Sequence, residues 1–406
     1  MDTVTMLNTL RRMKALKAGL RALKLIGVDG VMMHVWWGVV EGEGPKSYDW
    51  SAYLALVNLI KSAGLKVQAS MCFHGFSKAS ENCNISLPPW IMSIGKINPD
   101  IFFTDRSGNR FLECLSLSVD SLPLIGGRSP VQVYQDFLES FRESFGPYFG
   151  ETIVEVIMGL GPEGELRYPA YREGNGLWKF PGSGDRSSRR MHHHITSFQM
   201  IVASFKTHMG LGELPLDRVV VVGKVPGVHW WYKSKSHAAE VTAGYYNIEG
   251  QDGYDKIARM FRDNSAMMIL PCMEMSDKEQ SSEASCSPEM LLLQIRKACS
   301  RHGVPVSGQN SLPRFDDVAY SRIKNSIHRF DYPFIPRLAV FTFLRMGESL
   351  FYAEHWRLFV NFVRNMDKDA VWGDRRDGPP FEGGQNRTFL GISYLEEQGI
   401  RLQPIY

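Results

Sequence analysis

The 406-residue sequence lacks any apolar run of the roughly 18 residues that a membrane-spanning helix needs. Its first twenty residues, MDTVTMLNTLRRMKALKAGL, lack the apolar core of a secretory signal. An excess of one charge is also missing, because 46 basic and 43 acidic residues leave a formal net charge of +3. We therefore expect a protein that is not secreted, does not cross a membrane and has no electrostatic preference for nucleic acid.

Cysteine is scarce, and its spacing matches no metal or redox motif. The six cysteines are irregularly spaced, with no C-x-x-C, and are predicted to be free thiols. The run His192–His194 would point in different directions on a helix, so we expect a solvated helix face there rather than a metal site. The sequence predicts neither a metal nor a cofactor.

One stretch does match a cofactor motif. Residues 159–169, GLGPEGELRYP, contain a G-x-G-x-x-G after an apolar run, which is the pattern of a dinucleotide-binding turn. That turn requires a helix to begin inside the glycine loop, and Pro162 and Pro169 leave no room for one. We expect instead a tight turn that presents Glu165 at the end of a strand.

Seven short apolar runs predict parallel strands buried on both faces, at 31–37, 67–74, 152–159, 218–224, 266–271, 304–309 and 338–345. Amphipathic helical patterns alternate with them, at 12–27, 49–64, 131–146, 288–303 and 353–366. This alternation predicts an α/β fold. Polar residues follow nearly every run, which favours a (β/α)8 TIM barrel, where strand ends meet at one face, over an open sheet.

The predicted barrel lacks one strand. The sequence starts with a helical pattern, so a closed barrel of eight strands would need its first strand upstream of Met1. Either the chain is truncated or the barrel is open or irregular. We expect one barrel domain over residues 1–366, followed by a poorly ordered tail over 367–406.

Long motifs of the sequence resemble the plant β-amylases, glycoside hydrolase family 14. In chain order they include GVDGVMMHVWWGVVEGEGPKSYDW, LPPWI, GLGPEGELRYP, KVPGVHWWYKSKSHAAEVTAGYYN and SGQNSLPRFD. The resemblance implies a (β/α)8 barrel that releases β-maltose, with inversion, from the non-reducing ends of α-1,4-glucans. It extends over most of the chain, but a central excursion of the family is missing after WKFPGSG.

An inverting glycosidase uses two carboxyl groups, one as acid and one as base. By the resemblance, Glu165 is the proton donor. The family's base lies in a GENAL motif, which here reads GQNSL, so Gln309 occupies the position of the general base. Loss of a base costs roughly 10²–10⁴ in rate, and we therefore expect hydrolysis to be very slow or absent. Glu274 is the alternative base.

Other positions of the family's substrate site are altered or kept. His34 stands where the family has a glucose-binding aspartate, and Pro271 where it has a threonine near the base. The family's glycine flap is absent after His74, which is itself retained. The remaining residues to which the resemblance gives sugar-contacting or supporting roles are Lys224, His229, Trp230, Asn310, Ser311 and Arg345. The pair Trp230–Trp231 fits a sugar platform and a core pair equally well.

Three hypotheses for function follow. The first is a glucan-binding or regulatory pseudoenzyme of starch metabolism, and the second is an active β-amylase with a substitute base. The third is a scaffold that binds protein partners and no glucan. The expected partners are α-1,4-glucan, starch or maltose, together with starch-metabolising proteins. The resemblance implies a plant protein of the plastid or cytoplasm.

Overall fold

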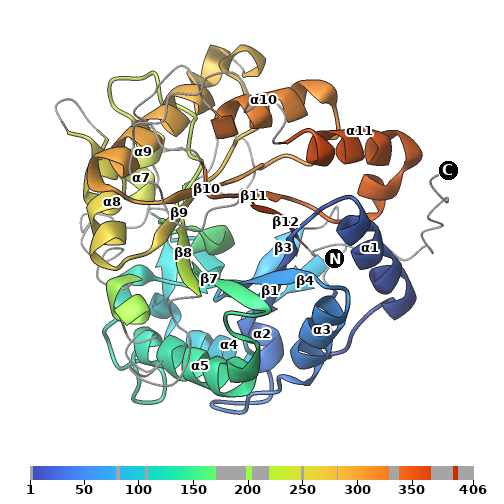
Figure 1. Cartoon of the computed structure of the whole chain (residues 1–406). Coiled ribbons are helices and arrows are strands. Elements are labelled where there is room, and N and C mark those ends of the chain that lie inside the picture. Colours follow the sequence, from blue (N-terminus) through green and yellow to red (C-terminus); the bar gives the residue numbers. More distant parts are fainter. Residues whose placement is uncertain are drawn as a thin grey trace.

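The computed structural model describes residues 3–78, 83–105, 108–170, 198–203, 219–247, 251–280, 282–328, 338–366 and 387–391. Within this part of the chain, eight parallel strands close into a barrel in the order β1-β12-β11-β10-β9-β8-β7-β2, and helices surround it (Figure 1). The strands are β1 Gly30–Trp36, β2 Lys66–Cys72, β7 Ile153–Gly159, β8 Val220–Lys224, β9 Met267–Leu270, β10 Val306–Gln309, β11 Val340–Phe343 and β12 Arg387–Gly391. The predicted (β/α)8 barrel is confirmed.

The outer helices begin and end at residues that favour helix termini. At the start of α5, Ser129 and Gln132 form a reciprocal capping box. The C-cap of α9 is Gly303, whose φ of 67° is the left-handed conformation that glycine adopts readily. The helices among the described residues include α1 Met13–Leu25, α2 Trp37–Val40, α3 Ser51–Ser62, α4 Pro89–Ile97, α5 Pro130–Phe145, α7 Ala238–Ala243, α8 Gly253–Asp263, α9 Pro288–His302, α10 Asp317–His328 and α11 Ala353–Arg364.

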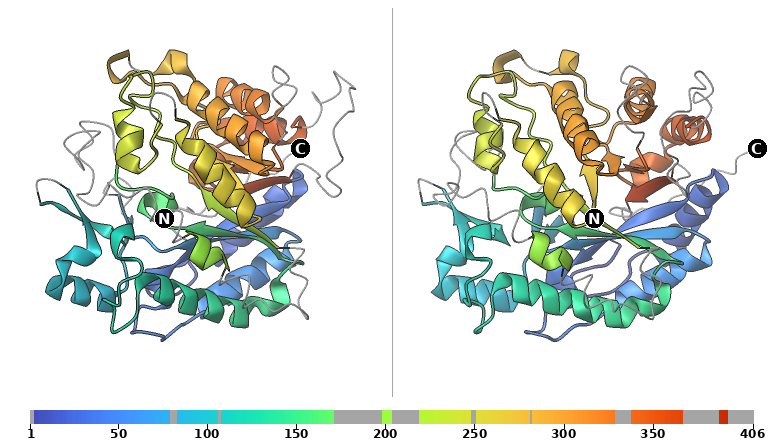
Figure 2. Two further views of the ribbon diagram at one scale, coloured as in Figure 1. Left: turned by 90° about the vertical axis from the view of Figure 1, so that its left-hand side faces the viewer. Right: turned by 60° about the vertical axis from the view of Figure 1, so that its left-hand side comes forward.

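Figure 2 shows α5 below the strands, on the opposite side of the barrel from α9 and α10. Two antiparallel pairs belong to the long connection between β2 and β7. They are β3 Phe76–Lys78 with β4 Cys83–Ile85, and β5 Phe102–Thr104 with β6 Arg110–Leu115. This connection therefore adds a small subdomain beside the barrel.

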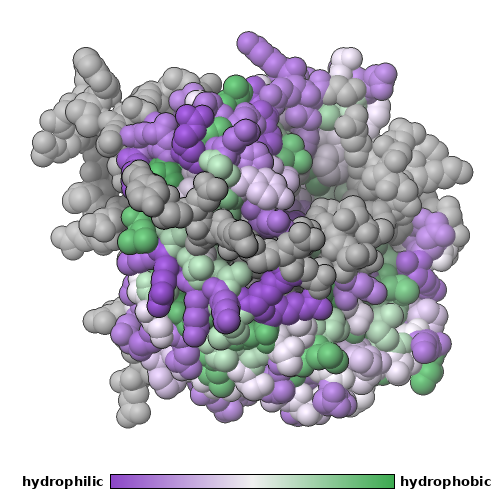
Figure 3. All heavy atoms as spheres, turned by 90° about the vertical axis from the view of Figure 1, so that its right-hand side faces the viewer, coloured by the Kyte–Doolittle hydropathy of each residue, from purple (hydrophilic) through white to green (hydrophobic). Residues whose placement is uncertain are grey.

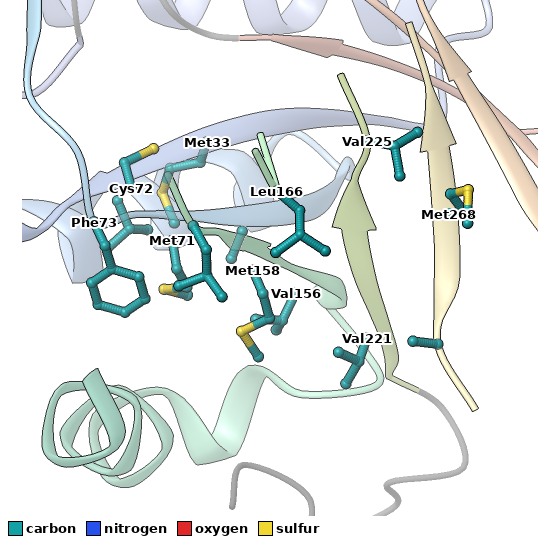
Figure 4. Packing of buried hydrophobic residues seen from close by; sticks show 14 of the residues in the cluster. Met33, Met71, Cys72, Phe73, Val156, Met158, Leu166, Val221, Val225 and Met268 are labelled. Carbon is teal, nitrogen blue, oxygen red and sulfur yellow. The ribbon is translucent and has the colours of Figure 1, made fainter. Parts of the chain in front are cut away.

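The main core lies between the barrel and the helices. Aromatic residues recur along α5 at helical spacing, and the ring centroids of Phe137, Phe141 and Phe145 lie 5.1–5.5 Å from that of Trp50. Each buried phenylalanine of this kind stabilises the fold by roughly 2 kcal/mol. Figure 4 shows the sulfur-containing and branched side chains that fill the core between neighbouring strands. The cysteine side chains in the described part of the chain, at 72, 114, 272, 286 and 299, are buried.

Inside the barrel, an apolar layer adjoins a polar chain. The apolar layer consists of Met32, Val154, Ile157, Val222, Met267, Ile269 and Val340. In the polar chain, the Thr342 hydroxyl donates to Gln68 Oε1 at 2.8 Å, and the Gln68 amide donates to Glu155 Oε2 at 2.5 Å. These bonds satisfy polar groups that would be costly to leave unpaired in the interior.

The eighth strand differs from the prediction. β12 pairs in parallel with β1 on one side and with β11 on the other, so the barrel closes without a strand upstream of Met1. The sequence prediction placed residues 387–391 in a poorly ordered tail, whereas the structure pairs them as β12. The physical reason is the two strand edges of β1 and β11, whose free N–H and C=O groups provide pairing partners for a short segment.

Some predicted segments lie outside the described residues. They are most of the tail, most of the shortened central segment and His192–His194. Within the central segment, residues 198–203 are helical, and Phe198 packs against Phe261 with ring centroids 4.8 Å apart.

On the side of the molecule drawn in Figure 3, hydrophilic residues are interspersed with hydrophobic ones over the coloured surface. The most exposed large apolar side chains, Leu7, Leu25 and Ile97, belong to separate segments of the chain, and such single exposures are normal. Among the described helices, none combines the length and apolar character needed to span a bilayer.

Candidate active site

Glu165 lies on a tight turn that follows β7. Gly161 has a φ of 81°, and a Cβ at this position would lie 2.6–2.7 Å from the carbonyl oxygens of Glu165 and Arg167. A single 3-10 turn, η5 (Pro162–Gly164), comes next, and Glu165 is extended with φ −94° and ψ 141°. The glycines therefore shape a turn toward a carboxylate, and the chain does not enter the α-helix that a dinucleotide would need.

The segment after Glu165 is fixed to β8 and to the core. The Leu166 N–H donates to the Lys224 carbonyl at 2.9 Å, and the Tyr245 hydroxyl donates to the Leu166 carbonyl at 2.7 Å. Leu166 is buried and belongs to the cluster drawn in Figure 4. Because its neighbour is anchored in this way, the Glu165 side chain has a defined position at the carboxyl end of the barrel.

Two cations hold the Glu165 carboxylate. Arg167 Nε donates to Glu165 Oε2 at 2.7 Å, and Lys224 Nζ lies 3.3 Å from Glu165 Oε1. Lys224 was predicted as a site residue, whereas Arg167 was not. The spacing of Arg167 from Glu165 could have identified it as a site residue, because residues two apart on an extended segment project to the same side.

A row of aromatic rings extends from β1 to the end of β2. The Trp36 ring stacks on His34 at 5.6 Å and meets His74 edge-on at 5.3 Å between centroids. His34 Nδ1, Trp36 Nε1 and His74 Nδ1 are buried and have no hydrogen-bond partner within the described structure. The neighbouring Trp37 differs from Trp36 in that its indole N–H has a partner, because it donates to Glu41 at 2.6 Å.

Both histidines are held in the neutral form. Burial, followed by charge repulsion from Arg345 and Lys224, lowers the pKa of His34 to about 3. Burial likewise lowers the pKa of His74 to about 3, with smaller contributions from His34, Lys224 and Arg167. These interactions place both histidines and the three cations in one electrostatic neighbourhood.

Arg345 follows β11 and reaches the same neighbourhood. Its guanidinium lies 5.9 Å from the centroid of the Phe76 ring, and that ring is 6.4 Å from Trp36. Asn310 fixes the backbone just before Arg345, because its amide accepts from the Leu344 N–H and donates to the Leu344 carbonyl. Asn310 thus supports the position of Arg345.

Gln309 is the last residue of β10, and its side chain is buried. Its Nε2 lies 3.7 Å from the Met32 sulfur, so the carboxamide points into the barrel interior. Glu274, the alternative base, is also buried. Its Oε1 accepts from the backbone N–H groups of Ser311 and Leu312 at 2.9 and 2.5 Å, and burial raises its pKa. Glu274 therefore holds the loop that follows Gln309.

The remaining predicted residues lie in the loops after β8, β9 and β10. His229 Nδ1 is 2.8 Å from the Gly227 carbonyl oxygen, and Pro271 packs closely against Gly227. Ser311 Oγ accepts from the Cys272 N–H at 3.1 Å. Trp230 is partly buried against the main core. These contacts show how the loops support one another, and they are not direct contacts with Glu165.

The family model of glycosyl hydrolase family 14 matches residues 1–210 and 216–371. The chain belongs to glycosyl hydrolase family 14. It is 38% identical over 419 residues to "Beta-amylase 2, chloroplastic" of Oryza sativa subsp. japonica, covering 90% of this chain and 75% of that protein. It is also 37% identical over 427 residues to "Inactive beta-amylase 9" of Arabidopsis thaliana, covering 92% and 77%.

A solved β-amylase structure agrees with the barrel. The catalytic domain of the β-amylase from Paenibacillus polymyxa matches with a TM-score of 0.72 at 23% identity, covering 88% of this chain and 95% of that one. At this identity the match supports the fold. The rice β-amylase and the inactive β-amylase of Arabidopsis thaliana differ in the activity that their names state but stand at nearly equal identity to this chain. Overall similarity to glycosyl hydrolase family 14 therefore does not decide whether this member hydrolyses glucan.

Proposed function

We propose that this protein binds the non-reducing ends of α-1,4-glucans and hydrolyses them very slowly or not at all. Gln309 is the observation that carries the proposal. It stands at the position of the family's general base, and the groups in contact there are its carboxamide and the Met32 thioether. Neither group accepts a proton at neutral pH, so the attacking water is not activated.

The proton donor of the family reaction has a counterpart in this chain. Glu165 is positioned by a rigid turn, but both of its oxygens are engaged, by Arg167 and Lys224. Glu274 has a structural role, because its Oε1 accepts from the backbone of the loop after Gln309, while its Oε2 is buried without a hydrogen-bond partner in the described structure. The geometry thus favours one retained half of an acid–base pair over a working pair with a new member.

Glucan binding is supported by the ring row. Trp36 provides an apolar ring and an indole N–H with no protein acceptor in the described structure, and sugars offer both an apolar face and hydroxyl oxygens. Lys224 and Arg345 supply further donors at the same face. We also propose a plastid location, because relatives such as the rice protein are named chloroplastic; immunodetection in fractionated chloroplasts tests this.

Maltose release from soluble starch tests the catalytic part. Wild type, Gln309→Glu, Glu165→Gln and the double variant should be assayed side by side. We expect wild type to be at the background level of Glu165→Gln and Gln309→Glu to exceed it, because a base is worth roughly 10²–10⁴ in rate. The gain should vanish in the double variant. Robust wild-type turnover that Glu165→Gln abolishes would instead establish an active β-amylase with another base.

Sedimentation with insoluble starch tests the binding part. Wild type should be retained, and Trp36→Ala should be retained less, while Trp356→Ala on α11 serves as a control for loss of a tryptophan elsewhere. If wild type is not retained at all, the glucan-binding proposal fails and a scaffold for protein partners becomes the better explanation.

A further inference from the structure

The candidate site carries more positive charge than the family pattern. By the family resemblance, His34 and Gln309 replace an aspartate and a glutamate, which shifts the formal charge of this face by two units toward positive when both are neutral. The cations Lys224 and Arg345 match the family. Of the carboxylates that reach this face in the described structure, Glu165 lies between Arg167 and Lys224, and Glu163 reaches Arg167 from the rim at 3.6 Å.

The buried nitrogens of the ring row add a second, independent observation. Trp36 and His74 are 5% and 6% exposed, yet Trp36 Nε1 and His74 Nδ1 have no hydrogen-bond partner in the described structure. An unsatisfied buried polar group is costly, and an indole N–H is a donor only. A ligand with acceptor oxygens, bound next to the cations, would therefore satisfy the unpartnered nitrogens of the ring row.

We propose that this face binds a glucose unit that carries a phosphate monoester, with Arg345 and Lys224 contacting the phosphate and Trp36 and His74 contacting sugar oxygens. This inference rests on the proposed glucan binding and specifies its ligand. A guanidinium presents its donors in a planar fork that matches phosphate oxygens, and an ammonium adds a point charge. The rings lie beside Arg345, because Arg345 sits over Phe76 and Phe76 neighbours Trp36. Lys224 is close enough to act electrostatically on His34 and His74, the two imidazoles of the row.

Calorimetric titration of the purified protein with four ligands tests the proposal. They are a phosphorylated maltodextrin, the same maltodextrin after phosphatase treatment, glucose 6-phosphate and inorganic phosphate. We expect the phosphorylated maltodextrin to bind roughly ten- to hundredfold more tightly than its dephosphorylated form, as expected for a charge-assisted contact. Glucose 6-phosphate that binds as tightly as the phosphorylated maltodextrin would identify a free sugar phosphate as the source of the group.

Charge variants separate the phosphate contact from general effects. Arg345→Gln and Lys224→Gln should each reduce the preference for phosphate, and His34→Asp/Gln309→Glu should nearly abolish it by restoring two carboxylates. Lys61→Gln is the matched control, because Lys61 pairs with Glu151 on the exposed surface near the start of β2.

Each outcome of the titration has a distinct meaning. Equal affinity for both maltodextrins overturns this inference and leaves the proposed function in place. Binding of neither maltodextrin overturns the proposed function. If only inorganic phosphate binds, and wild type and Arg345→Gln bind it with equal affinity, the protein has a non-specific anion site. This result also overturns the inference.

Discussion

Acidification should destabilise this protein through two buried histidines. The pKa values of His34 and His74 fall from 6.5 in the unfolded chain to about 3 in the folded one. Between these values the unfolded state binds more protons, so stability is lost as pH falls below about 6.5. At pH 5 the difference amounts to roughly 2 kcal/mol for each histidine relative to pH 7.5, and less than the sum for both because the two sites interact.

Urea unfolding at pH 7.5 and 5.0 measures this effect. Wild type should lose more stability on acidification than His34→Asn or His74→Asn, by roughly 2 kcal/mol in each case. Ser70→Ala is the matched control, since Ser70 is buried on β2 and does not titrate, and its loss should equal that of wild type. If the asparagine variants lose as much stability as wild type, then these imidazoles are protonated in the fold or exposed to water, and the reasoning is refuted.

Three further predictions concern stability. Asn310→Ala removes the amide that bonds in both directions to the backbone at the end of β11, so the free energy of unfolding should fall by roughly 2–4 kcal/mol in urea denaturation. Gly164→Ala places a Cβ 3.0 Å from an imidazole carbon at φ 69°, whereas Gly126→Ala has a similar φ of 57° and open space; thermal unfolding should show a larger loss for the first. Truncation after Met366 removes β12 and should cause aggregation or loss of cooperative melting, whereas truncation after Gly391 should not.

The seven predicted strands could be recognised in the sequence because each is buried on both faces of a parallel sheet. Such strands appear in a sequence as continuous apolar runs, and all seven are present within two residues of the predicted bounds. β12 was not recognised, since RTFLG mixes polar with apolar side chains and is not a continuous apolar run. Its place depends on the unpaired edges of β1 and β11, which are far away in the sequence.

The candidate site was predicted unevenly for a similar reason. The glycines and prolines around Glu165 have local consequences, so the turn could be inferred from sequence. The ion pair with Arg167 and the role of Glu274 as a loop support depend on where backbone groups lie in space. The neutral state of His34 also depends on three-dimensional burial, which no short motif reports.

Positions 34 and 309, where the family resemblance implies an aspartate and a glutamate, are physically linked, and this limits what one reversion can restore. Gln309 contacts Met32, which is two residues from His34 on the same strand and therefore projects to the same face. A carboxylate introduced by Gln309→Glu would favour the protonated form of His34 and raise its pKa. Because this pKa starts at about 3, the imidazole stays neutral near pH 7 and does not replace the glucose-binding aspartate that the family resemblance implies at position 34. We therefore expect His34→Asp/Gln309→Glu to release maltose faster than Gln309→Glu alone, and equal rates would show that the two positions act independently.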